Sequence, residues 1–134
     1  MARSTGIGGI FFKARDPQAL ADWYARHLGL PLNDQGNALL RWRAHDAPEK
    51  AGSTTWAPFP SGTDYFGPGG ASFMINYRVD DLDGLLANLR AAGVEVVQGP
   101  EAHENGKFAW LLDPDGNKVE LWEPKAWDQA NKGD

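Results

Sequence analysis

The sequence contains no cysteine, no run of basic residues and no apolar segment long enough to cross a membrane. The absence of cysteine excludes disulfides, zinc-thiolate sites and a cysteine nucleophile. The formal net charge is −5 and the Lys and Arg residues are scattered, which disfavours nucleic-acid or anionic-membrane partners. The N-terminus lacks the apolar core of a signal peptide. We therefore expect a cytoplasmic protein that binds neither nucleic acid nor membrane.

The chain has 134 residues, 42% of them hydrophobic, which suits one domain with a genuine core. Six Trp, six Phe and three Tyr are many large rings for so short a chain, so some are expected to line a pocket or an interface. We predict a single domain over residues 1–124. Residues 125–134 are polar, lack apolar periodicity and are expected to form a tail.

The first half of the chain predicts a strand, a helix and up to three further strands. Residues 7–14 are apolar and partly alternating, as in a strand. Asp16 and Pro17 form a helix start, and Gly29 stands where a left-handed cap would end that helix. The clearest later strands are expected at residues 38–45 and 53–59.

The same pattern returns in the second half. Residues 71–79 predict a strand, Asp81 a helix start and Gly93 the helix end. Ile10 aligns with Ile75 at an offset of 65 residues, which indicates an internal repeat. The strands expected after the second helix are 94–97, 108–112 and 118–122. We therefore predict two βαβββ modules, at about residues 7–60 and 71–123.

Two such modules can combine their sheets around a shared hollow, which is the natural binding site. Period-two alternation along the first strand directs Ile10, Phe12 and Ala14 towards the helix. The residues expected to face the hollow are Gly9, Phe11 and Lys13 and, by the repeat, Met74, Asn76 and Arg78.

These motifs resemble the glyoxalase/bleomycin-resistance/extradiol dioxygenase superfamily, also called vicinal oxygen chelate. The resemblance spans about residues 7–123 and is carried by FFKARDPQALADWYARHLGL, INYRVDDLDGLLANLRAAGVEV and LLDPDGNKVELWEP. It implies an α+β fold in which two βαβββ modules form a curved mixed sheet around the hollow. It also implies a small-molecule ligand and a homodimer.

The resemblance further implies where a divalent metal would be held in metal-dependent members. The matching first-strand positions are Gly9 and Met74, which are not plausible ligands, and only Glu120 stands where the family has its terminal carboxylate. We therefore expect no metal or other cofactor. An unusual metal site remains open, with His45, His103, Asp64 and Glu104 as its potential loop ligands.

Without a metal, aromatic walls and a few polar groups would bind the ligand. The candidate walls are Trp56, Phe59, Trp110 and Trp122, and the alternative is that they complete the core or a dimer seam. Lys13 and Arg78 could clamp an anion, or could form salt bridges with nearby Asp residues. The candidate ligand-binding residues are Phe11, Lys13, Trp56, Phe59, Asn76, Arg78, Trp110 and Trp122.

Glu120 is the candidate catalytic residue, because a carboxylate desolvated by an aromatic hollow could have a raised pKa suited to proton transfer. It could equally pair with a basic residue or accept backbone hydrogen bonds. The Gly- and Pro-rich segment 60–70, with two aromatic residues, is either a flap over the hollow or a surface linker.

Three functions stay open at this point. The leading hypothesis is a small-molecule-binding protein whose usual metal centre is lost. The second is a glyoxalase-like lyase or isomerase, with a rearranged metal site or metal-free acid-base catalysis by Glu120. The third is a structural module whose hollow is filled by its own aromatic rings.

Overall fold

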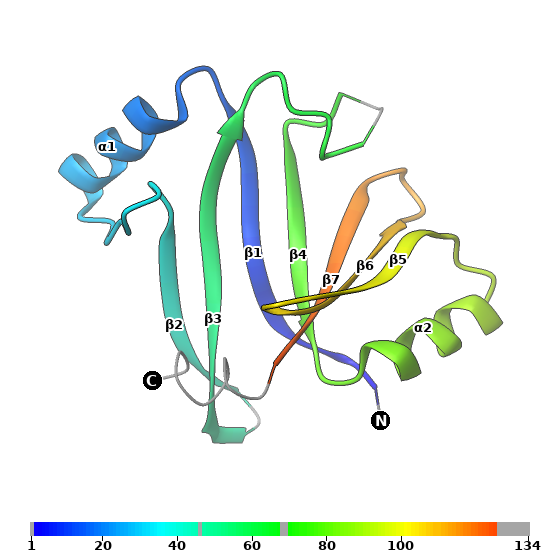
Figure 1. Cartoon of the computed structure of the whole chain (residues 1–134). Helices are drawn as coiled ribbons and strands as arrows, with labels where there is room; N and C mark the ends of the chain where they lie inside the picture. The colour runs from blue at the N-terminus through cyan, green and yellow to red at the C-terminus, as the bar shows by residue number, and fades with distance from the viewer. Residues whose placement is uncertain (1, 46, 68–69, 126–134) are drawn as a thin grey trace.

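The computed structural model describes residues 2–45, 47–67 and 70–125, and shows a curved seven-stranded mixed sheet with two helices (Figure 1). The strand order is β2-β3-β1-β4-β7-β6-β5. The elements are β1 (Ser4–Ala14), α1 (Pro17–Leu28), β2 (Ala38–Ala44), β3 (Ala47–Pro60), β4 (Phe73–Val79), α2 (Leu82–Ala91), β5 (Val96–His103), β6 (Gly106–Leu112) and β7 (Lys118–Pro124).

Both helices begin at the residues that the sequence predicts. The Asp16 side chain accepts a hydrogen bond from the Ala19 N–H, and Asp81 accepts one from the Gly84 N–H, so each satisfies a free amide of the first turn. Gly29 ends α1 in the left-handed conformation, with φ 67°. The cap of α2 is Ala92, one residue before the predicted Gly93.

The internal repeat is visible as two modules joined edge to edge within one chain. Strands β1 and β4 pair antiparallel, with Ile10 opposite Ile75. In the first module β1 pairs parallel with β3, and in the second β4 pairs parallel with β7. Figure 1 places α1 beside the first module and α2 beside the second, in line with their contacts. The predicted fold class is confirmed.

The predicted strand boundaries differ most from the structure at β3 and β5. Strand β3 begins at Ala47 instead of residue 53, because the β2–β3 hairpin continues its pairing to Ala44 opposite Ala47. In the described residues of the first module, only β2 and β3 follow α1, and an isolated bridge joins Leu32 to Ala38. Strand β5 covers Val96–His103, later than the predicted residues 94–97, because it pairs with β6 as far as the Gly106 turn.

The two faces of the sheet carry separate apolar clusters. On the helix side, Leu82 and Leu86 of α2 pack on Val79, Ala109 and Leu121. The opposite side, here called the inner face, buries Phe66, Met74 and Trp110. The predicted alternation of β1 is confirmed by two ring contacts. Phe11 contacts Phe59 on the inner face, and Phe12 contacts Trp56 on the helix side.

No helix in the described part of the chain is long and apolar enough to span a membrane. Of the predicted tail at residues 125–134, only Lys125 lies within the described residues.

Candidate functional site

Glu120 is buried on the inner face, with 2% of its surface exposed. Strand register brings two polar partners to it, because Glu120 of β7 is paired with Trp110 of β6 on one side and with Asn76 of β4 on the other. The Trp110 indole donates a hydrogen bond of 2.9 Å to Oε2, and the Asn76 amide donates one of 2.5 Å to Oε1.

The third donor to Glu120 is the Tyr65 hydroxyl, which bonds to Oε2. Tyr65 comes from the turn between β3 and β4, in which the Gly67 N–H donates to the Asp64 carbonyl. Burial, together with the negative charge of Glu120 and this hydrogen bond, raises the pKa of Tyr65 above its ordinary value. The phenol therefore keeps its proton and remains a donor.

The carboxylate is surrounded by aromatic rings. Phe59 stacks on Tyr65 with ring centres 5.8 Å apart and an interplanar angle of 4°, and it also contacts Phe11 and Phe66. Trp110 meets Tyr65 edge-on at 6.4 Å. On the other side of Trp110 the rings of Phe108 and Trp122 follow in a stacked row. We call Phe11, Phe59, Tyr65, Phe66 and Trp110 the aromatic cluster.

Two lysines flank the aromatic cluster. Lys13 Nζ lies 6.0 Å from the Phe66 ring centre. Lys118 Nζ donates a 2.8 Å hydrogen bond to the Tyr65 carbonyl and lies 5.0 Å from the Tyr65 ring centre. Sequence reasoning did not select Lys118 or Tyr65 as site residues. Alternation with Glu120 two residues later could have identified Lys118, whereas no local signal places Tyr65 on Glu120.

Lys13 and Arg78 lie at opposite ends of the inner face. Arg78 pairs with Gly6, and Lys13 follows seven residues further along β1, which corresponds to roughly 20 Å. One small anion cannot contact both. The Arg78 guanidinium instead lies over the rings of Trp122, at 5.1 Å, and Trp42, at 5.9 Å. Any ligand role of either residue stays a prediction.

Trp56 does not join the other candidates. Its ring contacts Phe12 at 5.0 Å and Tyr24 of α1 at 5.1 Å, so it faces the helix side. Because Trp56 and Phe59 are three residues apart in one strand, they point to opposite faces. The prediction that Trp56 and Phe59 together line the hollow is therefore wrong. The inner-face tryptophan of the first module is Trp42, whose ring covers Gly52.

The residues at the positions where metal-dependent members of the family hold their ion are not suited to binding a metal in this chain. A Cβ added at Gly9 would meet the Phe11 ring at 2.6 Å, so that ring covers the position. Met74 is 1% exposed and packs against Phe66 and Trp110. Glu120 already accepts three hydrogen bonds. Among the described residues, no three His, Cys, Asp or Glu side chains come together in a way that could hold a metal ion.

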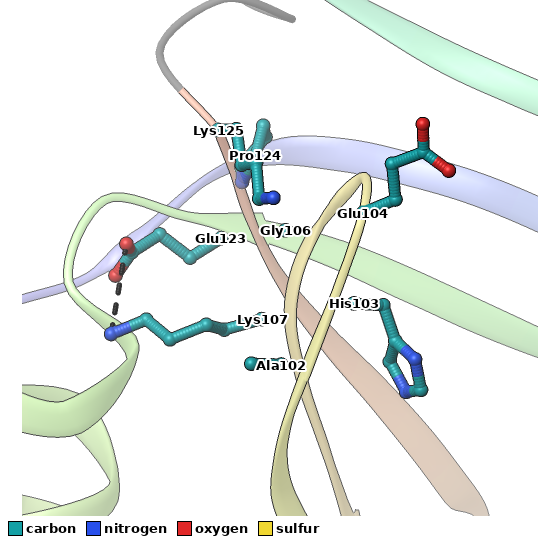
Figure 2. A pocket seen from close by; sticks show the side chains of 8 residues that line it. All are labelled: Ala102, His103, Glu104, Gly106, Lys107, Glu123, Pro124 and Lys125. Atoms are coloured by element: carbon teal, nitrogen blue, oxygen red, sulfur yellow. Dashed lines mark ion pairs between the residues drawn. The ribbon is translucent and has the colours of Figure 1, made fainter.

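A separate surface pocket of about 550 Å³ lies at the β5–β6 hairpin and the end of β7. Figure 2 shows Lys107 paired with Glu123 there, at 3.9 Å, with His103 and Glu104 turned away from that pair. None of the predicted ligand-binding residues lines it. The lining residues are Ala102, His103, Glu104, Gly106, Lys107, Glu123, Pro124 and Lys125.

The profile of the Glyoxalase/Bleomycin resistance protein/Dioxygenase superfamily matches residues 6–121. A search among curated protein sequences gives no match.

Solved structures of low sequence identity share the fold. A Streptomyces coelicolor methylmalonyl-CoA epimerase variant in complex with 2-nitronate-propionyl-CoA has a TM-score of 0.67 and 19% identity, covering 92% of this chain and 100% of that one. The methylmalonyl-CoA epimerase from Mycobacterium tuberculosis has a TM-score of 0.62 and 21% identity, covering 95% and 93%. A superfamily member from Vibrio splendidus has a TM-score of 0.54 and 13% identity, covering 92% and 99%.

Proposed function

Since the chain belongs to the Glyoxalase/Bleomycin resistance protein/Dioxygenase superfamily, we propose that it binds a small aromatic or amphipathic molecule on the inner face of its sheet. Binding does not use the usual metal centre of the family. Aromatic rings supply the contact area, and Glu120 supplies the polar anchor that orients the ligand.

The observation that carries this proposal is the environment of Glu120. The carboxylate is 2% exposed, and its three hydrogen-bond donors, the phenol, the amide and the indole, are all neutral. Removing a carboxylate from water costs several kcal/mol, and an apolar side chain of similar size would serve folding as well or better. A carboxylate kept in such a place is a candidate for ligand recognition.

Tryptophan fluorescence tests the proposal, because Trp110 touches the anchor whereas Trp23 is 49% exposed on α1. A panel of small aromatic and amphipathic compounds should contain members that quench the emission saturably at one equivalent. Trp110→Phe should remove most of that change, and the matched variant Trp23→Phe should retain it. If no compound in the panel quenches the emission saturably, the proposal is wrong.

A second candidate is metal-free acid-base catalysis at the same site. It is favoured by the contact between the Tyr65 hydroxyl and the Glu120 carboxylate, because such a pair can pass a proton. Methylmalonyl-CoA is the reference substrate, given the epimerases of similar fold. Exchange of its α-hydrogen for deuterium in D₂O, lost in Glu120→Gln, would favour the enzyme. Saturable binding without exchange would favour the binding protein.

A further inference from the structure

The inner face already holds one phenol, which belongs to the chain itself. The Tyr65 ring is stacked on Phe59, meets Trp110 edge-on, and its hydroxyl donates to Glu120. A stacking partner, an edge-on ring and a charged acceptor together form a complete binding site for a hydroxylated aromatic ring.

The Tyr65 side chain packs against the buried cluster from its edge and is not one of the fully buried residues. Its neighbours Ser61, Gly62 and Asp64 are exposed, and Tyr65 itself is only half-buried. Phe66, by contrast, is 2% exposed and packs against Met74 and Trp110. Rotation of the Tyr65 ring away from Glu120 therefore leaves Phe66 and the turn in place.

We infer that the ligand of this site is a phenol, which displaces the Tyr65 side chain and takes over its stacking on Phe59 and its hydrogen bond to Glu120. This inference rests on the proposed function and names the class of its ligand. The chain's own tyrosine then acts as an internal competitor that satisfies Glu120 until the ligand arrives.

The charges around the site select a neutral hydrogen-bond donor. An aromatic ring without a hydroxyl would leave the buried carboxylate one donor short, which is costly. An anionic ligand would be repelled by Glu120. A cationic ligand would meet Lys118, whose Nζ lies 5.0 Å from the Tyr65 ring centre and 5.9 Å from the Trp110 ring centre. A phenol avoids all three penalties.

Calorimetric titration with p-cresol and toluene tests the chemistry, because the two probes differ only in the hydroxyl. In Tyr65→Ala, p-cresol should bind at least about tenfold more tightly than toluene, as expected for a hydrogen bond to a charged acceptor. The double variant Tyr65→Ala/Glu120→Gln should lose most of this preference. Tyr24→Ala is the matched control, since it removes a tyrosine ring on the helix side against Trp56 and should bind p-cresol no more tightly than the wild type does.

Displacement is tested on the wild-type chain labelled with 3-fluorotyrosine, with the Tyr65 fluorine resonance assigned by Tyr65→Phe. Saturating p-cresol should shift that resonance towards its solvent-exposed position. Wild type should bind p-cresol more weakly than Tyr65→Ala does, because the internal phenol competes. If Tyr65→Ala does not fold, the wild-type displacement experiment still decides the inference.

Each other outcome has a defined meaning. Equal affinity for p-cresol and toluene in Tyr65→Ala overturns the phenol inference, as does p-cresol binding to the wild type with Tyr65 unmoved. Binding of p-cresol to Tyr65→Ala but not to the wild type also overturns it, since the site then serves only Tyr65. If non-phenolic aromatics quench the wild-type fluorescence and p-cresol does not bind, the proposed function stands without this ligand class. If nothing binds, both fail.

Discussion

The hydroxyl of Tyr65 donates a hydrogen bond to the buried carboxylate of Glu120, although 55 residues separate them in the sequence. The bond joins the turn between the two modules to the last strand of the sheet. It is therefore both a tertiary contact that closes the inner face and the polar centre of the candidate site.

Alkaline pH should destabilise the protein through Tyr65. Its pKa is raised in the folded state, so the unfolded chain releases the proton first, and stability present below about pH 10 falls as the pH rises above it. Urea unfolding at pH 8 and pH 10.5 should show a larger loss for wild type than for Tyr65→Phe. Tyr24→Phe, on the helix side, serves as control and should behave as wild type. Equal losses in all three proteins would refute this role.

Replacing Asn76 by Asp should destabilise the protein in a pH-dependent way. The substitution preserves shape but places a second carboxylate 2.5 Å from Glu120 Oε1. Since like charges raise the pKa of one partner, the variant should lose about 3 kcal/mol of unfolding free energy at pH 7, and the deficit should shrink as the pH is lowered towards about 4.

Chemical denaturation across this pH range measures the deficit of Asn76→Asp. Asn88→Asp is the matched control, because Asn88 is exposed on α2. A deficit for Asn76→Asp that stays constant with pH would show that repulsion is not its cause.

The space above Gly52 is filled by the Trp42 ring, so an added methyl group should be costly there. A Cβ at Gly52 would lie 2.4 Å from Trp42 Cη2, whereas one at Gly62 would meet no atom within 4 Å. Gly52→Ala should lose about 1–3 kcal/mol of unfolding free energy, and Gly62→Ala should change it by less than about 0.5 kcal/mol. Similar midpoints in urea for both variants would contradict the packing of Trp42 on this strand.

Metal loading should not produce a stoichiometric complex. Gly9 offers no donor, the Met74 thioether is a poor ligand for hard or borderline divalent ions, and Glu120 already accepts three hydrogen bonds. Elemental analysis after incubation with Ni, Co, Zn, Mn or Fe(II) and desalting should give well below one equivalent. Near-stoichiometric retention that Glu120→Gln abolishes would establish a metal site and overturn the metal-free proposal.

The fold was predictable because its signals are local and occur twice. Each signal involves only residues close together in the sequence. These signals are the capping carboxylates Asp16 and Asp81, the αL glycine at position 29 and the alternation along β1. The 65-residue offset then relates one module to the other, and the structure confirms it. The predicted start of β3 was wrong because this strand continues through Pro48 and Gly52, residues that usually interrupt strands.

The sequence also placed Glu120, Trp110 and Asn76 in one site, because strand parity determines which side chains share a face. Tertiary structure decided what completes that site. The position of Tyr65 depends on how an irregular turn packs across the sheet, and the position of Trp42 depends on the register of the β2–β3 hairpin, which pairs it with Gly52. Local periodicity carries no information on either, since both contacts arise only when separate strands are brought side by side.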